Sequence, residues 1–321
     1  MTALRPTAAD VRAAHERIAS HIRRTPLEFS PQLSRSLGLE LYAKLENFQV
    51  TGSFKARGAM NKLLSLRPGA VSHGVIAASS GNHGQAVAWG ARKLKGQATV
   101  FVPSTVDPSK RTAIEAWGAR CVVSGDDCVE TEAAAREYGA REGLTYLPPY
   151  NDPVVIAGQG TTGLEIAEQL PEVDAVFVAL GGGGLVAGMA TWLREVRPQT
   201  KIIGCSPDQS PALHECMKAG RVIDVPCHPT LSDATAGGVE EGAITVDLCR
   251  EYLDESLLVS EAEIASSMRE YIDAHHQLIE GSAAVALAAI SRERDRFEGQ
   301  RVAVVICGGN VGRDKLMEVL K

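Results

Sequence analysis

The sequence lacks several features that would point to particular classes of protein. No stretch approaches the roughly 20 apolar residues of a membrane span, and the N-terminal segment lacks the apolar core of a secretory signal. Basic residues are not in excess, because 33 lysines and arginines face 39 acidic residues, for a net charge of −6. This balance argues against a general nucleic-acid binder, which must neutralise phosphates. We therefore expect a protein that binds neither membranes nor nucleic acid.

Paired cysteines are also missing. The seven cysteines are scattered, odd in number and form no CxxC pair. Such a set is typical of reduced thiols in the cytosol and argues against a disulfide framework or a zinc site. The sequence therefore predicts a cytoplasmic protein without a structural metal.

Strand and helix signals alternate along most of the chain. Apolar runs predict strands over 74–79, 97–102, 120–124, 174–180, 201–206 and 301–307, and amphipathic stretches predict helices over 84–94, 108–117, 162–169 and 185–196. This alternation indicates βαβ units and parallel sheets, hence an α/β fold. A length of 321 residues allows two domains or one large unit. The proline-containing segment 205–235 is predicted to be irregular.

The first of three unusual turns follows the strand predicted over 74–79. It reads Ser79, Ser80, Gly81, Asn82 and His83 and leads directly into a helix. Exposed backbone amides at a helix start suit a carboxylate or another anion. Taken alone, however, the turn favours an ordinary capped helix.

The second turn follows the strand predicted over 174–180 and consists of Gly181, Gly182, Gly183 and Gly184 before Leu185. Glycines leave the amides unobstructed and permit positive φ, which favours a phosphate site over a plain flexible turn. The spacing matches neither the dinucleotide fingerprint nor the P-loop.

The third turn begins at Cys307 and continues with two glycines and Asn310. In isolation, a cysteine at a buried strand end is usually a small hydrophobic residue.

Lys55 stands in a short basic stretch behind Gly52, Ser53 and Phe54, where a helix is predicted to begin. A lone lysine is usually a solvated charge. At a helix N-terminus, however, the dipole opposes a cation and favours the neutral amine, which is the form that reacts with an aldehyde.

Together, the Lys55 stretch and the three turns resemble, in order and spacing, the fold-type II pyridoxal-phosphate enzymes, in particular the threonine/serine dehydratases and serine racemase. The resemblance covers nearly the whole chain. It implies two open, mostly parallel twisted sheets flanked by helices, as in the tryptophan synthase β fold. It also implies a large cofactor-binding domain over 1–70 and 150–321 and a small substrate-gating domain over 71–149.

Residue by residue, the resemblance implies that Lys55 holds pyridoxal 5′-phosphate as a Schiff base and then acts as the base at the substrate Cα. Phe54 would pack beside the ring, and Cys307 would lie at the pyridine nitrogen. Glu280 would lie near the ring, although a plain helix-capping role is the alternative. The cofactor phosphate would be bound by the backbone amides of Gly181, Gly182, Gly183, Gly184 and Leu185.

The resemblance also implies a substrate site. The substrate carboxylate would be bound by Ser79, Ser80, Gly81, Asn82 and His83. Asn82 would also bond the cofactor 3′-oxygen, and Ser80 would face the ring from the side opposite Lys55. Tyr150 would line the substrate site and favours a dehydratase over a racemase.

The activity expected from the resemblance is β-elimination from a 3-hydroxy amino acid such as L-threonine or L-serine, giving a 2-oxo acid and ammonia. Larger substrates, including those of hydroxyectoine utilisation, and serine racemisation remain alternatives, as do a nucleotide-binding oxidoreductase and a non-catalytic cofactor-binding module. The divalent-cation site of many relatives would fall at Ser206 and Ala212, which lack carboxylates, with Asp208 as the alternative carboxylate nearby. We therefore expect no metal, a small-molecule substrate and a homodimer or other homo-oligomer.

Overall fold

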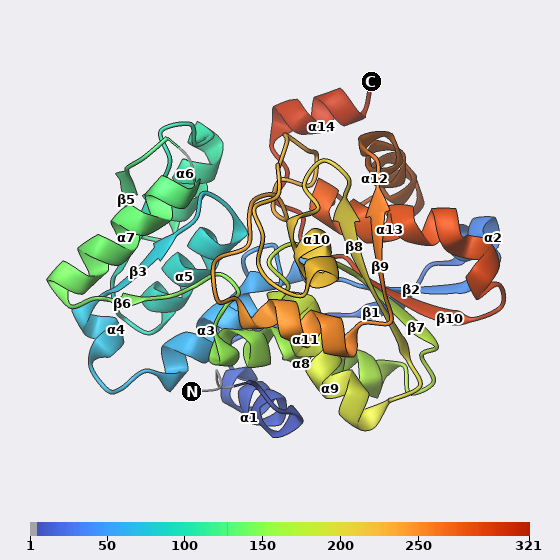
Figure 1. Cartoon of the computed structure of the whole chain (residues 1–321), viewed down its shortest axis with the longest axis horizontal. Helices are drawn as coiled ribbons and strands as arrows, with labels where there is room; N and C mark the ends of the chain where they lie inside the picture. Colours follow the sequence, from blue (N-terminus) through green and yellow to red (C-terminus); the bar gives the residue numbers. More distant parts are fainter. Residues whose placement is uncertain (1–4, 127) are drawn as a thin grey trace.

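The computed structural model describes residues 5–126 and 128–321 and contains two separate sheets (Figure 1). The larger sheet has six strands in the order β1-β2-β10-β7-β8-β9. All its neighbours are parallel except β1 and β2. The strands are β1 (Leu27–Phe29), β2 (Glu40–Lys44), β7 (Ala175–Ala179), β8 (Lys201–Pro207), β9 (Glu255–Val259) and β10 (Arg301–Val305).

The smaller sheet has four strands, all parallel, in the order β5-β4-β3-β6. They are β3 (Val75–Ala78), β4 (Ala98–Val102), β5 (Arg120–Val123) and β6 (Thr145–Tyr146). Each sheet has its own cluster of buried apolar side chains. The predicted α/β fold with two mostly parallel sheets is thereby confirmed.

Helices cover both sheets and join them (Figure 1). The helix α3 (Lys55–Ser65) packs against α5 (Asn82–Lys93) and α8 (Pro153–Gln169), and so stands between the two parts. The remaining helices are α1 (Ala8–Ile18), α2 (Pro31–Leu37), α4 (Ala70–His73), α6 (Pro108–Ala116), α7 (Cys128–Glu142), α9 (Gly184–Val196), α10 (Ala212–Ala219), α11 (Ile244–Tyr252), α12 (Glu261–His275), α13 (Gly281–Glu293) and α14 (Arg313–Val319), with short 3₁₀ turns η1 (Glu46–Phe48) and η2 (Arg294–Phe297). No helix in the described part of the chain is both long and apolar enough to cross a membrane.

The structure corrects two of the predicted elements. The helix predicted over 162–169 begins at Pro153, because Asp152 caps it and proline occupies its first turn, while the apolar residues that follow lack the polar face of an amphipathic pattern. The segment predicted to be irregular contains α10, which ends where Gly220 adopts the left-handed conformation. Residues 221–243 contain neither helix nor strand.

A buried charge network fixes α3 to the larger sheet. Arg57 is fully buried, and its guanidinium donates to both carboxylate oxygens of Glu46 at 2.7 Å and to those of Glu165 at 2.7 and 2.9 Å. Lys44 on β2 also donates to Glu165, at 2.6 Å. Two cations and two anions therefore balance in the interior, which is the condition for burying such charges without a large penalty.

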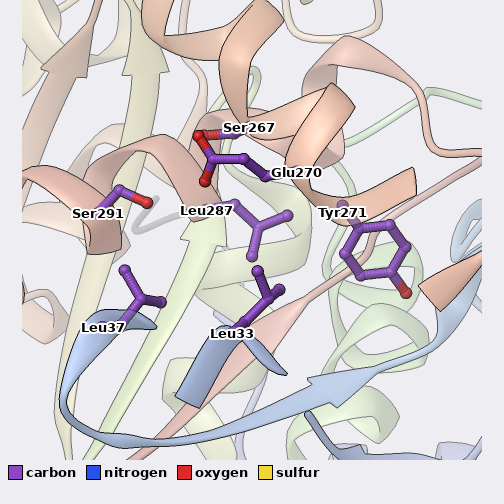
Figure 2. Close-up of a pocket in the computed structure, with 7 residues that line it drawn as sticks. All are labelled: Leu33, Leu37, Ser267, Glu270, Tyr271, Leu287 and Ser291. Carbon is purple, nitrogen blue, oxygen red and sulfur yellow. The ribbon is translucent and has the colours of Figure 1, made fainter. Parts of the chain in front are cut away.

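A small cavity between α2, α12 and α13 lies apart from the turns described above (Figure 2). Leu33, Leu287 and Tyr271 are among its lining residues, and its volume of about 10 Å³ is close to that of a single water site. It lies about two turns along α13 from Glu280 and is too small for an organic ligand.

Candidate active site

Lys55 is the first residue of α3, and its side chain points into the region between the two sheets. Its Nζ donates to the carbonyl oxygen of Pro149 at 2.8 Å and lies 5.2 Å from the centroid of the Phe54 ring. Burial lowers the Lys55 pKa to about 8, although the nearby Cys307 and Glu280 act in the opposite direction. The amine is therefore more easily neutralised, as the sequence predicts, but desolvation is the main cause.

The turn after β10 lies directly against the stretch before Lys55. The backbone amide of Phe54 donates to the carbonyl of Cys307 at 3.0 Å, and Ser53 pairs with Gly308 in an isolated antiparallel bridge. Burial raises the pKa of the Cys307 thiol well above its usual value, so the thiol stays protonated. Residues 253 positions apart thus form one edge of the site through backbone contacts.

Glu280 connects this edge to the smaller sheet. Its carboxylate accepts from Asn82 Nδ2 at 2.9 and 3.1 Å and from the backbone N–H of Asn310 at 3.2 Å. It occupies the N-cap position of α13 but makes no side-chain cap hydrogen bond, which excludes the plain capping role. Burial raises the Glu280 pKa to about 7, and the two asparagines only partly offset this.

The first glycine-containing turn presents open amides where α5 begins. Within the described chain, the backbone amides of Ser80, Asn82 and His83 have no hydrogen-bond acceptor, whereas the Gly81 amide donates to Ser79 Oγ at 3.2 Å. His83 Nε2 bonds the Leu147 carbonyl at 2.9 Å, and burial lowers the His83 pKa to about 3. This turn can bind a carboxylate through neutral donors and the positive end of a helix.

The second turn is built against two side chains. A Cβ at Gly182 would stand 2.5 Å from the Tyr150 ring, and Gly183 has a φ of 86° that other residues rarely adopt. Among the described residues, nothing accepts a hydrogen bond from the amides of 181–185, and the buried Thr245 hydroxyl beside Gly183 has no partner. Unpaired donors gathered at a helix N-terminus are the arrangement that a phosphate group requires.

A cleft of about 350 Å³ opens beside the first turn. Ser80 lines it from the smaller sheet's side, with Lys110, while Asp233 and Lys315 line it from the other side. Lys110 Nζ lies 2.7 Å from an Asp233 oxygen, which ties residues of the irregular segment to α6. The polar lining and the adjacent open amides suit a small, charged molecule.

The whole chain also resembles a known protein family. Residues 18–308 match the family described as pyridoxal-phosphate dependent enzyme. The chain belongs to this family. Its cofactor is pyridoxal 5′-phosphate, and the amine at Lys55, the phosphate-type nest at 181–185 and the neutral Cys307 thiol are residues that fit it.

The family member resembles several characterised proteins. The L-threonine ammonia-lyase of Geobacter sulfurreducens is 39% identical over 94% of this chain and 75% of its own length. The processed threonine deaminase isoform 2 of Solanum lycopersicum superposes with a TM-score of 0.92 at 34% identity, covering 97% of this chain and 90% of that one. Serine racemase of Dictyostelium discoideum superposes with a TM-score of 0.88 at 33% identity, covering 96% and 99%.

The structure brings the predicted site residues of this pyridoxal-phosphate enzyme around one region. Tyr150 lies against the glycine turn, and its hydroxyl accepts from the Glu240 amide at 2.8 Å. Ser206, where the resemblance would place a cation-binding carboxylate, donates to the Leu180 carbonyl at 2.7 Å. No group of three or more metal-ligating side chains occurs within residues 5–126 and 128–321.

Two residues of the site have no role that the sequence predicts. The sequence marks Asn310 only as the end of the third turn, and it does not mark Thr245. The signal for Asn310 was its place directly after two glycines. Thr245 carries no local signal, because its relation to the glycine turn depends on where α11 packs.

Proposed function

We propose that the chain is a pyridoxal-phosphate-dependent ammonia-lyase that converts a 3-hydroxy amino acid such as L-threonine or L-serine into a 2-oxo acid and ammonia. The observation that carries the proposal is the meeting of three parts in one region. These are the lysine amine with a pKa of about 8, the open amides at the start of α5 and the nest at 181–185. The named relatives support the same reaction class.

Each part has a distinct task in the proposed reaction. The bound cofactor supplies the electron sink that weakens the substrate Cα–H bond. Lys55 would hold the cofactor covalently and would then accept the Cα proton at Nζ. Burial lowers the Lys55 pKa to about 8, which increases the neutral fraction of the amine near neutral pH. The amides of Ser80, Asn82 and His83 orient the substrate carboxylate, so that the Cα proton faces the lysine.

Cys307 would lie at the ring nitrogen of the bound cofactor, where it would influence the direction of the chemistry. A neutral Cys307 thiol cannot form the ionic pair that an aspartate would form, so it does not help to hold negative charge in the ring. Rapid loss of the substrate's β-hydroxyl is then favoured over slow proton return to Cα. Serine racemisation is the second candidate, supported by the likeness to the Dictyostelium serine racemase.

The experiment is a panel of L-threonine, L-serine and larger acidic or aromatic 3-hydroxy amino acids, assayed for 2-oxo acid and ammonia. We expect activity with the small hydroxy amino acids in the wild type and in Lys93→Ala, whose side chain is exposed at the end of α5. Lys55→Ala should lose both the visible cofactor band and the activity. A Lys55→Ala variant that keeps both refutes the proposal, and D-serine as the main product from L-serine favours racemisation.

We also propose the finer assignments. Residues 1–70 and 150–321 form the cofactor-binding domain, and 71–149, which contain the smaller sheet, gate the substrate. Six cysteines are free thiols, and they support the proposed cytosolic location. Light scattering tests the proposed homodimer, and hydroxyectoine-derived compounds added to the substrate panel test the proposed substrate from hydroxyectoine breakdown.

A further inference from the structure

Two side-chain amides meet where the two sheets approach each other. Asn310, in the loop after β10, donates from Nδ2 to Oδ1 of Asn82, in the first turn of α5, at 2.6 Å. An asparagine amide has a donor end and an acceptor end of nearly equal shape, so a rotation of 180° exchanges them. The hydrogen bonds around each amide therefore decide which end faces which neighbour.

The orientation of the pair is fixed from the Asn310 side. Asn310 Nδ2 also donates to the backbone carbonyl of Thr51, at 2.9 Å. A carbonyl can only accept, so Asn310 must direct its NH₂ group toward Thr51, and its second N–H then points at Asn82. Gly52 makes room for this contact, because a Cβ there would stand 2.7 Å from the Asn310 amide oxygen.

The consequence for Asn82 is that its oxygen faces Asn310 and its NH₂ group faces Glu280. The two carboxylate oxygens of Glu280 lie 2.9 and 3.1 Å from the same Asn82 nitrogen, so one N–H can be shared between them. The second N–H is left for a ligand. Glu280 could not fix this orientation alone, because a carboxyl with a pKa of about 7 can also donate near neutral pH.

We propose that Asn310 is a positioning residue that orients the Asn82 amide, so that Asn82 offers an N–H donor to an anionic oxygen of the bound cofactor. The orientation is transmitted from the Thr51 carbonyl through Asn310 to Asn82 across the region between the two sheets. The inference rests on the cofactor and on the proposed place of its site, and it does not depend on which amino acid is the substrate.

A double-mutant cycle on cofactor affinity tests the proposal. The chain is stripped of cofactor and retitrated with pyridoxal 5′-phosphate in four forms: wild type, Asn310→Asp, Asn82→Ala and the double variant. In Asn310→Asp the near-isosteric side chain can only accept, so Asn82 turns its NH₂ toward residue 310 and presents its oxygen to the cofactor. We expect affinity to fall about tenfold or more, as it does when a polar contact becomes a repulsive one.

The double variant distinguishes positioning from a structural role. If Asn310 acts through Asn82, Asn310→Asp lowers affinity no further once Asn82 is alanine. The proposal is overturned if the fold-losses in cofactor affinity of the two single variants multiply in the double variant, or if Asn310→Asp binds the cofactor with wild-type affinity. If Asn310→Asp does not fold, Asn310→Ala takes its place in the cycle, with an expected loss of about threefold or more because the Asn82 amide is then free to turn. Failure of the wild type to turn over any hydroxy amino acid would count against the proposed reaction and leave this affinity cycle intact.

Discussion

Replacing Arg57 by methionine should show how much the buried charge network contributes to stability. Arg57 is fully buried, and its removal leaves Glu46 and Glu165 buried with Lys44 as the remaining cation. Breaking a buried ion pair by removing one partner costs about 3–5 kcal/mol, because an uncompensated charge stays in the interior. We expect a loss of this size in the free energy of unfolding at pH 7, measured by urea denaturation of the cofactor-free chain.

The matched control is Arg24→Met. Arg24 pairs at 2.6 Å with Glu168, which lies on α8 like Glu165, but both side chains are half exposed. Exposed pairs contribute about 0–1 kcal/mol, so the two variants should differ clearly. If Arg57→Met lowered the free energy of unfolding by less than about 1 kcal/mol, the argument that removing Arg57 leaves an uncompensated buried charge would be refuted.

The pH dependence of the stability loss in Arg57→Met distinguishes a lost charge interaction from a packing defect. In the wild type, burial raises the Glu165 pKa, but Arg57 and Lys44 outweigh it and the net pKa is lowered. A lowered pKa contributes stability above the unfolded pKa and loses it as the pH falls. The variant lacks most of this contribution, so the difference in unfolding free energy between wild type and variant should narrow as the pH falls below the ordinary glutamate value of 4.5. A deficit that stays constant would point to a cavity instead.

Three further predictions concern the cofactor site. Gly182→Ala should weaken cofactor binding, because its Cβ would meet the Tyr150 ring at 2.5 Å, whereas Gly238→Ala, with no atom within 4 Å, should not; equal affinities would contradict the crowding argument. Cofactor uptake by the apoprotein should quicken with pH and level off above about 8, the Lys55 pKa; a midpoint near 10.5 would mean that the amine is solvated. Burial raises the Glu280 pKa from 4.5 to about 7, so the stability that this group contributes is lost between those values as the pH rises. Glu280→Gln should remove this pH dependence, on the order of 3 kcal/mol in the unfolding free energy of the apoprotein. An unchanged pH dependence would show that other groups cause it.

The strands β3, β4, β7, β8 and β10 could be predicted because they are apolar and buried along most of their length, whereas the half-buried β9 was not predicted. Those predicted over 74–79, 174–180 and 301–307 agree with β3, β7 and β10 to within two residues. The strands β1 and β6 are only three and two residues long, which is too short for a periodic signal. The early part of α8 lacked an amphipathic pattern because both of its sides are buried.

The site could be predicted in its parts but not in its connections. The positions of Lys55 and the three turns follow from local sequence, since glycines and polar residues after apolar strands are readable signals. The contact between Asn82 and Asn310 joins residues 228 positions apart, and the position of Thr245 depends on the packing of α11. No local pattern encodes either of them. The cause of the lowered Lys55 pKa likewise required knowledge of its burial.

The strand order has a consequence for how the protein is made. Strand β10 is the last strand in the chain, yet it pairs with β2 on one side and β7 on the other, near the middle of the larger sheet. A nascent chain therefore carries a gap in that sheet until its final portion leaves the ribosome, and only then do Ser53 and Gly308 meet. We therefore expect the cofactor to bind only after this last strand has joined the larger sheet, because Ser53 and Gly308 lie next to Phe54 and Cys307.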